Sequence, residues 1–540
     1  MPKTFRGVVA AAGAALLALL MAACAQDTDQ PSASTVQTAP EPLSACELLS
    51  NAAIPGVEIA TAEALAVSER RIQLPAPVTL RREVPHCRIV GTIDSAIGFE
   101  LLMPDEWNGK FLMGGGGGYV GSIQNSAEEL PIPGGSALER GYATVGTDTG
   151  HQAGVMDASW ALNDPQAQEN FAHRAVHRTA EVSKQIIAQY YTDEPAFSYF
   201  FGCSRGGGQA LISAQRYPQD FDGIISGAPA LDWTGFASGM IQTQQRIFPD
   251  PSDLSAPVIT AQNRELLNDS ILAQCDTLDG LADGILTDPR MCAFDPATLP
   301  RCESGPAADC LTDTQLEAIQ SVYSPVVIDG EELYTGWPFG GETVGWPAWI
   351  TKAEGGPALP PGAPPNAHFG FGTQLVKNFI YSDPQWTYVD YDFDDWAERS
   401  APVAELLNAT DPDLSQMRDR GAKLIVWHGW SDSALSAIDT IDYYEAVGAL
   451  DSSADEYLRM YLMPGVAHCF GGPGPDQVDW IGAIEQWVEQ DIRPAELIAQ
   501  KRDPSGNITM QRPICPYPQQ PRYSGSGDAS NAASFVCAAD

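Results

Sequence analysis

The segment 200–208 most restricts how this chain of 540 residues can fold. Its sequence, FFGCSRGGG, places Ser204 in a Gly-x-Ser-x-Gly pattern. An aromatic run predicted as a strand, 197–201, precedes the serine, and a predicted helix, 206–216, follows it. Glycines on either side leave room for a sharp turn that exposes the serine hydroxyl at the edge of a sheet. The pattern predicts an α/β sheet with Ser204 as a nucleophile; the alternative is a turn that serves only packing.

A serine attacks a carbonyl group only when a base takes its proton, so a histidine is required. On this type of sheet the acid and then the histidine follow the serine along the chain. Of the seven histidines, His468 is best placed, in a loop directly after a predicted strand, whereas His428 ends a strand and suits a structural hydrogen bond. Asp432 follows that strand, but Asp439 and Asp442 fall on the next predicted helix, where solvated carboxylates are expected. The sequence therefore predicts a triad of the serine, Asp432 and His468.

Two further features support this site. Cys203 directly precedes the predicted nucleophile and Cys469 directly follows the predicted base, so a disulfide between them would hold the two side chains together, although other pairings stay open. The oxyanion of a tetrahedral intermediate needs backbone N–H donors. We predict one donor on Arg205 and the other in a run of five glycines, at Gly116 or Gly117. A phosphate-binding loop is disfavoured because no Gly-Lys-Ser/Thr follows the glycines.

The N-terminus and the cysteines predict an exported protein. A basic start precedes an apolar run, 8–20, which is too short to span a bilayer comfortably, and small residues lead to Cys24. Leu-Met-Ala-Ala-Cys resembles a bacterial lipobox, so we predict residues 1–24 as a signal peptide with lipidation of Cys24; an ordinary cleavage nearby is the alternative. Residues 25–45 are predicted to be a flexible tether. The other ten cysteines predict five disulfides in a periplasmic, outer-membrane-anchored or secreted protein.

The predicted strands and helices form an α/β-hydrolase sheet domain that a large lid domain interrupts. Residues 46–230 are predicted as the first part of the core and 410–540 as its second part with a disulfide-closed tail. Residues 231–409 have a different composition, rich in Pro, Gly, Trp and Asp, which predicts that they form the lid. Its aromatic side chains are expected either to wall a substrate pocket or to form the lid's own core. These are Trp337, Phe339, Trp346, Trp349, Phe369 and Phe371.

The segment 275–285, with the sequence CDTLDGLADGI, carries three carboxylates and two glycines in one turn-rich stretch. Closely spaced hard oxygen ligands suit Ca²⁺. The loop is not an EF-hand because the glutamate at its end is missing. A solvated acidic turn is an equally good interpretation of the spacing alone.

The formal net charge of −39 would repel phosphate backbones and anionic membrane surfaces. Nucleic-acid binding is therefore a poor hypothesis, and a membrane is expected only through the N-terminal lipid. No feature of the sequence implies a protein partner.

Several stretches together resemble the tannase and feruloyl esterase family, which includes an enzyme that hydrolyses mono(2-hydroxyethyl) terephthalate. They are Gly-Cys-Ser-Arg-Gly-Gly at 202–207, Gln-Arg-Tyr-Pro at 215–218 with Gly-Ala-Pro at 227–229, the loop 275–285, His-Gly-Trp-Ser-Asp at 428–432, and 464–475. The resemblance implies a serine carboxylic ester hydrolase that acts through an acyl-enzyme. The expected substrate is a small aromatic ester of the phenolic-acid type, such as a feruloyl or galloyl ester.

The resemblance also implies roles for individual residues. It places the triad at Ser204, Asp432 and His468. Structural Ca²⁺ is implied at the carboxylates of Asp276, Asp279 and Asp283 with the carbonyls of Leu281 and Ile285. The implied disulfides are Cys46–Cys87, Cys203–Cys469, Cys275–Cys292, Cys302–Cys310 and Cys515–Cys537.

The chain departs from the family pattern in two ways. Gly208 stands where relatives often carry Arg, and no lid arginine aligns with the carboxylate-binding arginine of the terephthalate monoester hydrolase. Activity like that of a terephthalate monoester hydrolase is therefore the alternative to phenolic-acid esters. A lipid-tethered binding protein that has lost catalysis and a serine peptidase or amidase on the same fold are rivals from other classes.

Overall fold

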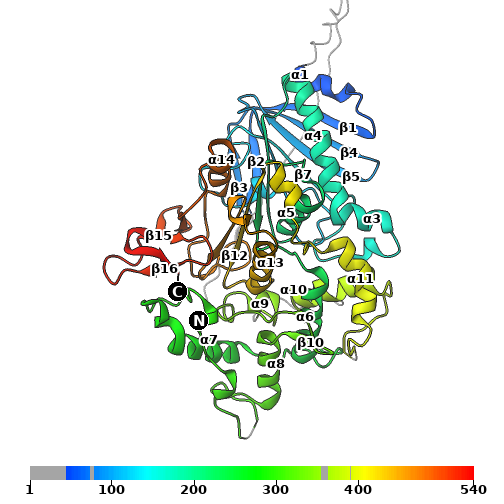
Figure 1. Cartoon of the computed structure of the whole chain (residues 1–540). Coiled ribbons are helices and arrows are strands. Elements are labelled where there is room, and N and C mark those ends of the chain that lie inside the picture. Colours follow the sequence, from blue (N-terminus) through cyan, green and yellow to red (C-terminus); the bar gives the residue numbers. More distant parts are fainter. Residues whose placement is uncertain (1–43, 73–77, 304, 354–362, 390, 540) are drawn as a thin grey trace, which may run out of the picture. The chain divides into compact units, whose positions relative to one another are not determined.

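A nine-stranded mixed sheet forms the centre of the computed structural model (Figure 1). The described residues are 44–72, 78–303, 305–353, 363–389 and 391–539. In spatial order the strands are β1 (Val57–Leu65), β4 (His86–Ile93), β5 (Ile97–Pro104), β7 (Ala143–Thr147), β6 (Lys110–Gly114), β8 (Phe197–Cys203), β9 (Gly223–Gly227), β12 (Lys423–Gly429) and β13 (Leu458–Met463). The pairs from β1 to β7 are antiparallel, and those from β7 to β13 are parallel. This is the sheet of an α/β hydrolase, as predicted.

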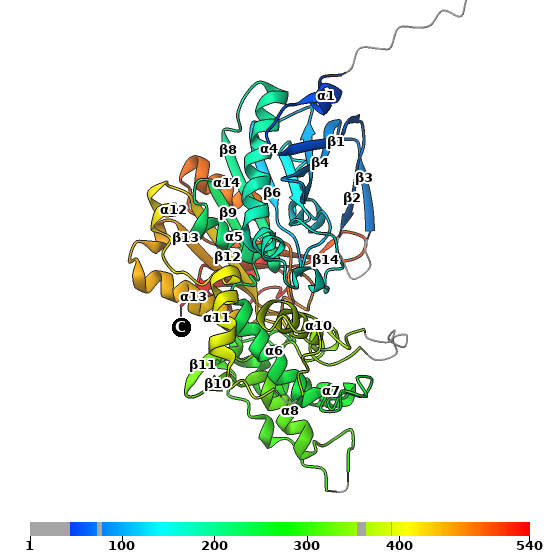
Figure 2. The ribbon, with the colours of Figure 1, turned by 90° about the vertical axis from the view of Figure 1, so that its right-hand side faces the viewer.

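The parallel strands are buried on both faces because helices cover each face (Figure 2). Along β8, Phe200 joins one apolar cluster, whereas Tyr199 and Phe201 join another. The first cluster includes α4 (Ala175–Tyr191), α5 (Arg205–Arg216) and α13 (Ala437–Leu450), and the second includes α14 (Trp480–Gln490). The alternation explains why these strands have continuous apolar sequences.

The antiparallel strands β1, β4 and β5 were not predicted from the sequence. In β4 and β5 fully buried residues alternate with half-buried ones, which is typical of strands with one wet face. A tight turn joins them, and Asp94 and Ser95 in that turn have φ values of 51° and 64°. Alternation together with this turn is the signal that could have found the hairpin. A second hairpin pairs β2 (Ser68–Ile72) with β3 (Val78–Arg82).

Between β9 and β12 the chain leaves the sheet and forms the lid. Its two ends lie side by side, because the Ala409 N–H donates to the Leu231 carbonyl at 2.7 Å and the Asn408 amide donates to Asp232 Oδ1 at 2.6 Å. The lid has an apolar core of its own, which is continuous with Tyr119 of the sheet domain. Its main elements are α6 (Trp233–Ile247), α7 (Ala261–Cys275), α8 (Asp313–Tyr323), β10 (Val326–Ile328), β11 (Glu331–Tyr334), α10 (Ala367–Leu375) and α11 (Trp396–Leu407).

The C-terminal tail forms two small antiparallel sheets. One pairs β14 (Leu497–Arg502) with β15 (Ile508–Ile514), and the other pairs β16 (Gln520–Tyr523) with β17 (Phe535–Ala538). The disulfide Cys515–Cys537 closes the tail, as the resemblance implied. An ion pair between Arg512 and Asp283 joins the tail to the acidic loop of the lid.

The described residues lie in one compact unit, Leu43–Asp540. The predicted signal peptide, Cys24 and nearly all of the predicted tether lie outside the described residues. Within the described ranges no helix is both long enough and apolar enough to cross a membrane. Five disulfides are present there, which indicates folding in an oxidising compartment and supports export.

The carboxylate of Asp148, directly after β7, makes the stability of the folded protein depend on pH. Its Oδ1 accepts the N–H groups of Gly98 and Gly150, both at 2.8 Å, and burial outweighs these bonds and raises its pKa to about 6. Since an unfolded aspartate titrates near ~3.9, the native state keeps its proton to higher pH, and stability is lost as pH rises through about 6. We expect Asp148→Asn to raise the free energy of unfolding at pH 8 by about 1–2 kcal/mol, and to change it little at pH 4. Urea unfolding at both pH values tests this.

The asparagine keeps Oδ1 as the acceptor of both bonds and removes the charge, with an NH2 group in place of Oδ2. Exposed Asp193, changed to Asn, is the matched control and should give the same small effect at both pH values. A gain for Asp148→Asn that does not depend on pH would contradict the account.

Candidate active site

Ser204 lies on a strained turn between β8 and α5. Its φ and ψ are 63° and −123°, a conformation that residues with side chains rarely adopt. A Cβ atom on Gly202 would lie 2.3 Å from the carbonyl oxygen of Gly206, so this position requires glycine. The Ser204 N–H donates to the Gly227 carbonyl at 3.0 Å and fixes the turn against β9. The glycines of the motif therefore have the steric role that the sequence analysis gave them.

Asp432 and His468 lie in contact, one after β12 and the other after β13. His468 Nδ1 is 2.7 Å from Asp432 Oδ2, and Asp432 Oδ1 accepts the N–H groups of Ala434 at 2.7 Å and Leu435 at 3.2 Å. Burial alone would raise the pKa of Asp432, but the imidazoles of His468 and His428 outweigh it and hold the pKa well below its ordinary value. Ionised Asp432 thus accepts the Nδ1–H of His468 and orients the ring. The other nitrogen of the ring, Nε2, is left free to act on the substrate. The other candidates, Asp439 and Asp442, lie on α13 as predicted; Asp442 is exposed, whereas burial raises the pKa of Asp439 well above its ordinary value, so the expected solvation does not hold there.

His428 contacts the same carboxylate. Its Nε2 lies 3.0 Å from Asp432 Oδ2, and its Nδ1 lies 2.8 Å from Thr440 Oγ1 on α13. His428 and the Asp432 side chain are fully buried. The sequence analysis expected a structural hydrogen bond here and did not foresee that its partner would be the predicted catalytic acid.

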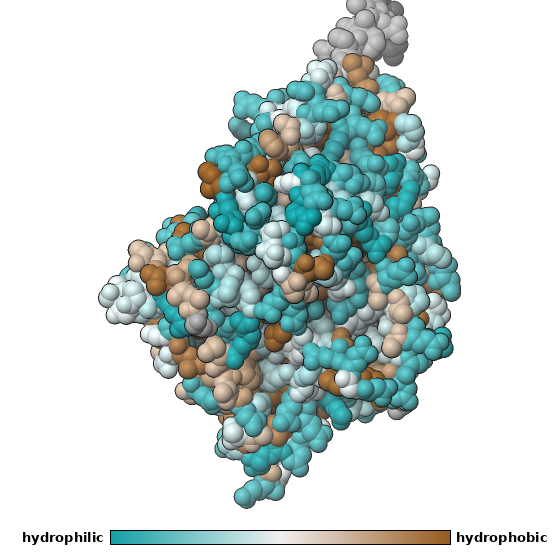
Figure 3. Space-filling model, viewed as in Figure 1, coloured by the Kyte–Doolittle hydropathy of each residue, from teal (hydrophilic) through white to brown (hydrophobic). Residues whose placement is uncertain are grey.

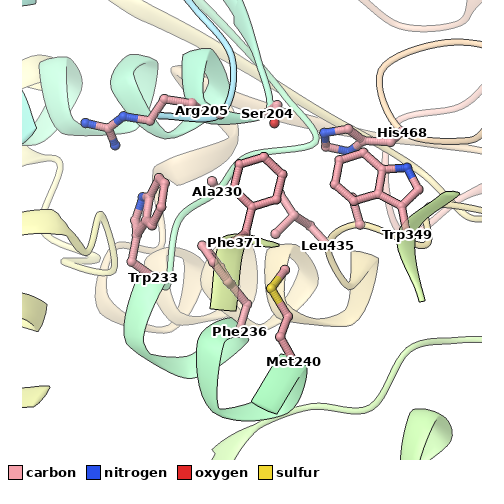
Figure 4. A pocket seen from close by; sticks show the side chains of 12 residues that line it. Ser204, Arg205, Ala230, Trp233, Phe236, Met240, Trp349, Phe371, Leu435 and His468 are labelled. Atoms are coloured by element: carbon pink, nitrogen blue, oxygen red, sulfur yellow. The ribbon is translucent and has the colours of Figure 1, made fainter. Parts of the chain in front are cut away.

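The structure brings Ser204 and His468 together at one pocket, where their side chains lie next to each other (Figure 4). Their neighbours Cys203 and Cys469 form a disulfide with Cα atoms 5.9 Å apart. The ring of Trp349, from the lid, packs edge-on against His468 with 4.9 Å between ring centroids. The other four disulfides present are Cys46–Cys87, Cys275–Cys292, Cys302–Cys310 and Cys515–Cys537, the pairs that the resemblance implied.

The pocket opens to solvent and spans about 330 Å³ when that open space is included, and its walls are almost wholly apolar. Of the six lid aromatics named from the sequence, Trp349 and Phe371 line it, whereas Trp337 and Trp346 are buried in the lid core. The wall that α6 provides was not predicted from the sequence. That wall consists of Trp233, Phe236 and Met240. Their spacing of three and four residues places them on one helical face, and this spacing is the signal that could have found them.

The two glycines predicted for the oxyanion hole do not agree with the structure. The Gly116 N–H donates to Gln209 Oε1 at 3.1 Å, and the Gly117 N–H donates to Gln124 Oε1 at 2.7 Å, so both amides are already occupied. Gly118 lines the pocket beside Ser204 with a φ of 54°, and among the described residues its N–H has no hydrogen-bond acceptor. The occupation of Gly116 could not be predicted from sequence, because Gln209 lies 93 residues further along the chain.

The side chain of Arg205 turns away from Ser204 and His468 (Figure 4). Its guanidinium donates to the carbonyls of Phe171 and Ala172 and lies 4.3 Å from the centroid of the Phe171 ring. Burial lowers the pKa of Arg205 to about 9. Arg205 therefore offers the pocket its backbone N–H rather than its charge.

The acidic loop follows α7. Asp276 Oδ1 accepts the Gly284 N–H at 2.9 Å, and Asp279 Oδ1 accepts the Leu281 N–H at 3.0 Å. Asp283 Oδ1 accepts the Ile285 N–H at 3.1 Å, and its other oxygen pairs with Arg512. Within the described part of the chain no three acidic, histidine or cysteine groups are gathered closely enough to hold a metal ion. The oxygen-only donor set suits Ca²⁺ chemically, and calcium stays a prediction.

Comparison with known proteins agrees with the geometry. The sequence profile of the family described as "Tannase and feruloyl esterase" matches residues 82–538. The chain is 35% identical to mono(2-hydroxyethyl) terephthalate hydrolase of Piscinibacter sakaiensis, with 92% of each chain covered. It is 30% identical to a probable feruloyl esterase of Arthroderma benhamiae, with 92% of this chain and 94% of the relative covered.

Solved structures share the fold. Feruloyl esterase B from Aspergillus oryzae superposes with a TM-score of 0.80 at 25% identity, over 92% of this chain and 99% of that one. Tannin acyl hydrolase from Aspergillus niger has a TM-score of 0.68 at 20% identity, over 90% and 92% of the two chains. A strand-turn-helix serine, the chain order serine, aspartate, histidine, and a covering lid define an α/β hydrolase of the serine type. The chain belongs to the tannase and feruloyl esterase family and is a carboxylic ester hydrolase.

Proposed function

We propose that the protein hydrolyses small esters of aromatic acids, of the feruloyl or galloyl type, through an acyl-enzyme on Ser204. One observation carries the aromatic assignment. The pocket that starts at Ser204 is walled by Trp233, Phe236, Trp349 and Phe371, with few polar atoms. A flat aromatic acyl group packs favourably against such walls because both surfaces leave water. The names of two relatives with at least 30% identity, a terephthalate monoester hydrolase and a probable feruloyl esterase, support aromatic acids as the class.

The chemistry follows from the positions of the side chains. The Ser204 hydroxyl attacks the ester carbonyl while His468 Nε2 takes its proton, and the imidazolium then gives this proton to the leaving alcohol. Asp432 holds His468 in the required tautomer and stabilises its positive charge. Water then attacks the acyl-enzyme by the same route and releases the acid.

The oxyanion of the two tetrahedral intermediates needs two donors. We assign the N–H of Arg205, at the N-terminus of α5, and the N–H of Gly118. Both residues line the pocket beside Ser204. The partial positive charge of the helix N-terminus supports the same assignment.

An ester panel tests the acyl specificity. In the described residues no charged group faces the pocket, because the Arg205 guanidinium is turned away and held by carbonyls. A carboxylate in this pocket would lose its hydration without a partner. We therefore expect kcat/KM for methyl ferulate or methyl gallate to exceed that for a terephthalate monoester by about tenfold or more. The neutral methyl ester of that monoester should recover turnover.

Faster hydrolysis of the anionic monoester than of its neutral methyl ester would favour the alternative, a terephthalate monoester hydrolase. The anilide of ferulic acid, compared with methyl ferulate, separates an esterase from an amidase or peptidase. No turnover of any ester by folded protein would favour a non-catalytic binding protein.

We also propose that the loop 275–285 holds structural Ca²⁺. Its ligands would be the carboxylates of Asp276, Asp279 and Asp283 and the carbonyls of Leu281 and Ile285. A cation bound only to the native state adds about 2.7 kcal/mol of stability at a concentration 100 times its Kd. Removing calcium with EGTA should therefore lower the Tm, and Ca²⁺ but not Mg²⁺ should restore it. Asp279→Asn should reduce the effect. An identical Tm with EGTA and with Ca²⁺ would contradict the proposal.

For the N-terminus we propose lipidation at Cys24, supported by the lipobox-like sequence before it. The full chain expressed in a bacterium should partition into the detergent phase, and Cys24→Ala should move it to the aqueous phase. Equal partitioning of the two would indicate an ordinary cleaved signal peptide.

A further inference from the structure

We propose that His428 is a positioning residue that acts through Asp432: it shares the carboxylate oxygen that orients His468 and so sets how readily His468 accepts a proton. The inference rests on the proposed role of His468 as the general base.

The shared oxygen is the first observation. Asp432 Oδ2 lies 2.7 Å from His468 Nδ1 and 3.0 Å from His428 Nε2, while Oδ1 is occupied by two backbone N–H groups. A carboxylate oxygen accepts but does not donate, so both imidazole nitrogens must carry protons. The negative charge that His468 meets is therefore divided between two donors.

Thr440 provides the second observation. His428 Nδ1 lies 2.8 Å from Thr440 Oγ1, and the threonine hydroxyl can donate to it. With Nδ1 as acceptor, the neutral ring carries its proton on Nε2, facing Asp432. The His428 ring and the hydroxyl that fixes its tautomer both come from regular elements, because His428 lies on β12 and Thr440 on α13. Full burial of His428 and Thr440 keeps water from replacing either bond.

Other groups near this network do not replace His428. On the lid, His368 Nε2 lies 3.2 Å from the Ala434 carbonyl, and burial lowers the pKa of His368 to about 4, so it stays neutral. The Tyr334 hydroxyl accepts the Ser436 N–H, and burial raises its pKa well above the ordinary value. The titratable groups around the pair are thus Asp432, His368 and Tyr334, and Asp439 on α13 interacts with Tyr334 and Asp232 rather than with either histidine.

The consequence concerns the acid limb of the pH–rate profile. Without the His428 donor, the full charge of Asp432 would act on His468, which would then hold a proton at higher pH and be inactive as a base there. Asp432 would also lose one of the hydrogen bonds that fix the orientation of its carboxylate. The first change alters the pH profile, and the second lowers kcat, while KM is set by the pocket and should stay nearly constant.

The test compares His428→Leu with His428→Gln, using kcat/KM for methyl ferulate from pH 5 to 9. Leucine removes the N–H donor that faces Asp432. The amide nitrogen of glutamine reaches about as far from the backbone as His428 Nε2 does, so glutamine can still donate to Asp432. We expect the acid limb of His428→Leu to move up by about half to one pH unit, with kcat about tenfold lower near pH 7. His428→Gln should stay within about twofold of wild type, with its acid limb unmoved.

A purely structural role would lower the Tm and leave the acid limb in place, and that result would overturn the inference. If His428→Leu does not fold, Thr440→Val and Thr440→Ser provide the same comparison. Valine removes the hydroxyl that fixes the tautomer and should move the limb in the same direction, whereas serine should not. An inactive wild-type enzyme would instead refute the proposed function, so the two failures are distinguishable.

Discussion

Replacing Ser204 by alanine is expected to lower kcat for ester hydrolysis by about 10⁴- to 10⁶-fold while the protein stays folded. The variant removes the only atom of Ser204 that forms the acyl bond. Alanine meets the same strain as serine at a φ of 63°, so the Tm should change little. Initial rates with methyl ferulate, together with thermal unfolding, measure both effects.

Ser213→Ala is the matched control. Ser213 lies on the same helix, and its hydroxyl donates only to the Gln209 carbonyl, four residues earlier. It should keep near wild-type turnover. A Ser204→Ala enzyme with more than a few per cent of wild-type activity would show that another residue carries the acyl group.

Asp432→Asn is expected to lower kcat by about 10³- to 10⁴-fold. All four partners of this side chain are donors: two imidazole N–H groups and the N–H groups of Ala434 and Leu435. An amide has one acceptor oxygen and one donor nitrogen, so it must leave a buried donor unpaired or turn His468 into the wrong tautomer. The same mismatch should cost about 1–3 kcal/mol of stability.

Asp442→Asn, on the adjacent helix α13, provides the comparison and should keep its activity. Steady-state kinetics and urea unfolding of both variants test the prediction. Comparable loss of kcat in both would mean that Asp432 has no special relation to His468.

The surface agrees with a site that lies within a pocket. The face seen in Figure 3 is largely hydrophilic, with apolar residues in small, separate groups. The apolar side chains that suit an aromatic acyl group instead line the pocket beside Ser204, and most of them come from the lid, on α6 and at Trp349 and Phe371. Specificity therefore depends on the lid, whereas the reacting groups come from the sheet domain.

The sequence was most informative about features that short segments determine, such as the triad. Ser204, Asp432 and His468 follow strands with continuous apolar sequences, and the carboxyl ends of parallel strands meet at one edge of a sheet. Their order along the chain and the flanking Cys203 and Cys469 are enough to predict that the three side chains meet.

Contacts between distant segments could not be predicted in the same way. The Gly116 amide donates to the side chain of Gln209, which lies 93 residues further along the chain, so no local pattern indicates this contact. His428 was assigned a structural bond, but only the meeting of β12, β13 and α13 shows that Asp432 serves two histidines. In each case the deciding partner depends on tertiary packing rather than on local pattern.

Labelling with a fluorophosphonate, followed by mass spectrometry of the digested protein, tests the central claim most directly. We expect a single adduct on the peptide that contains Ser204, formed in step with the loss of ester hydrolysis and absent from denatured enzyme. An adduct on another residue with Ser204 unmodified, or no adduct on folded and active enzyme, would contradict the assignment of Ser204 as the nucleophile.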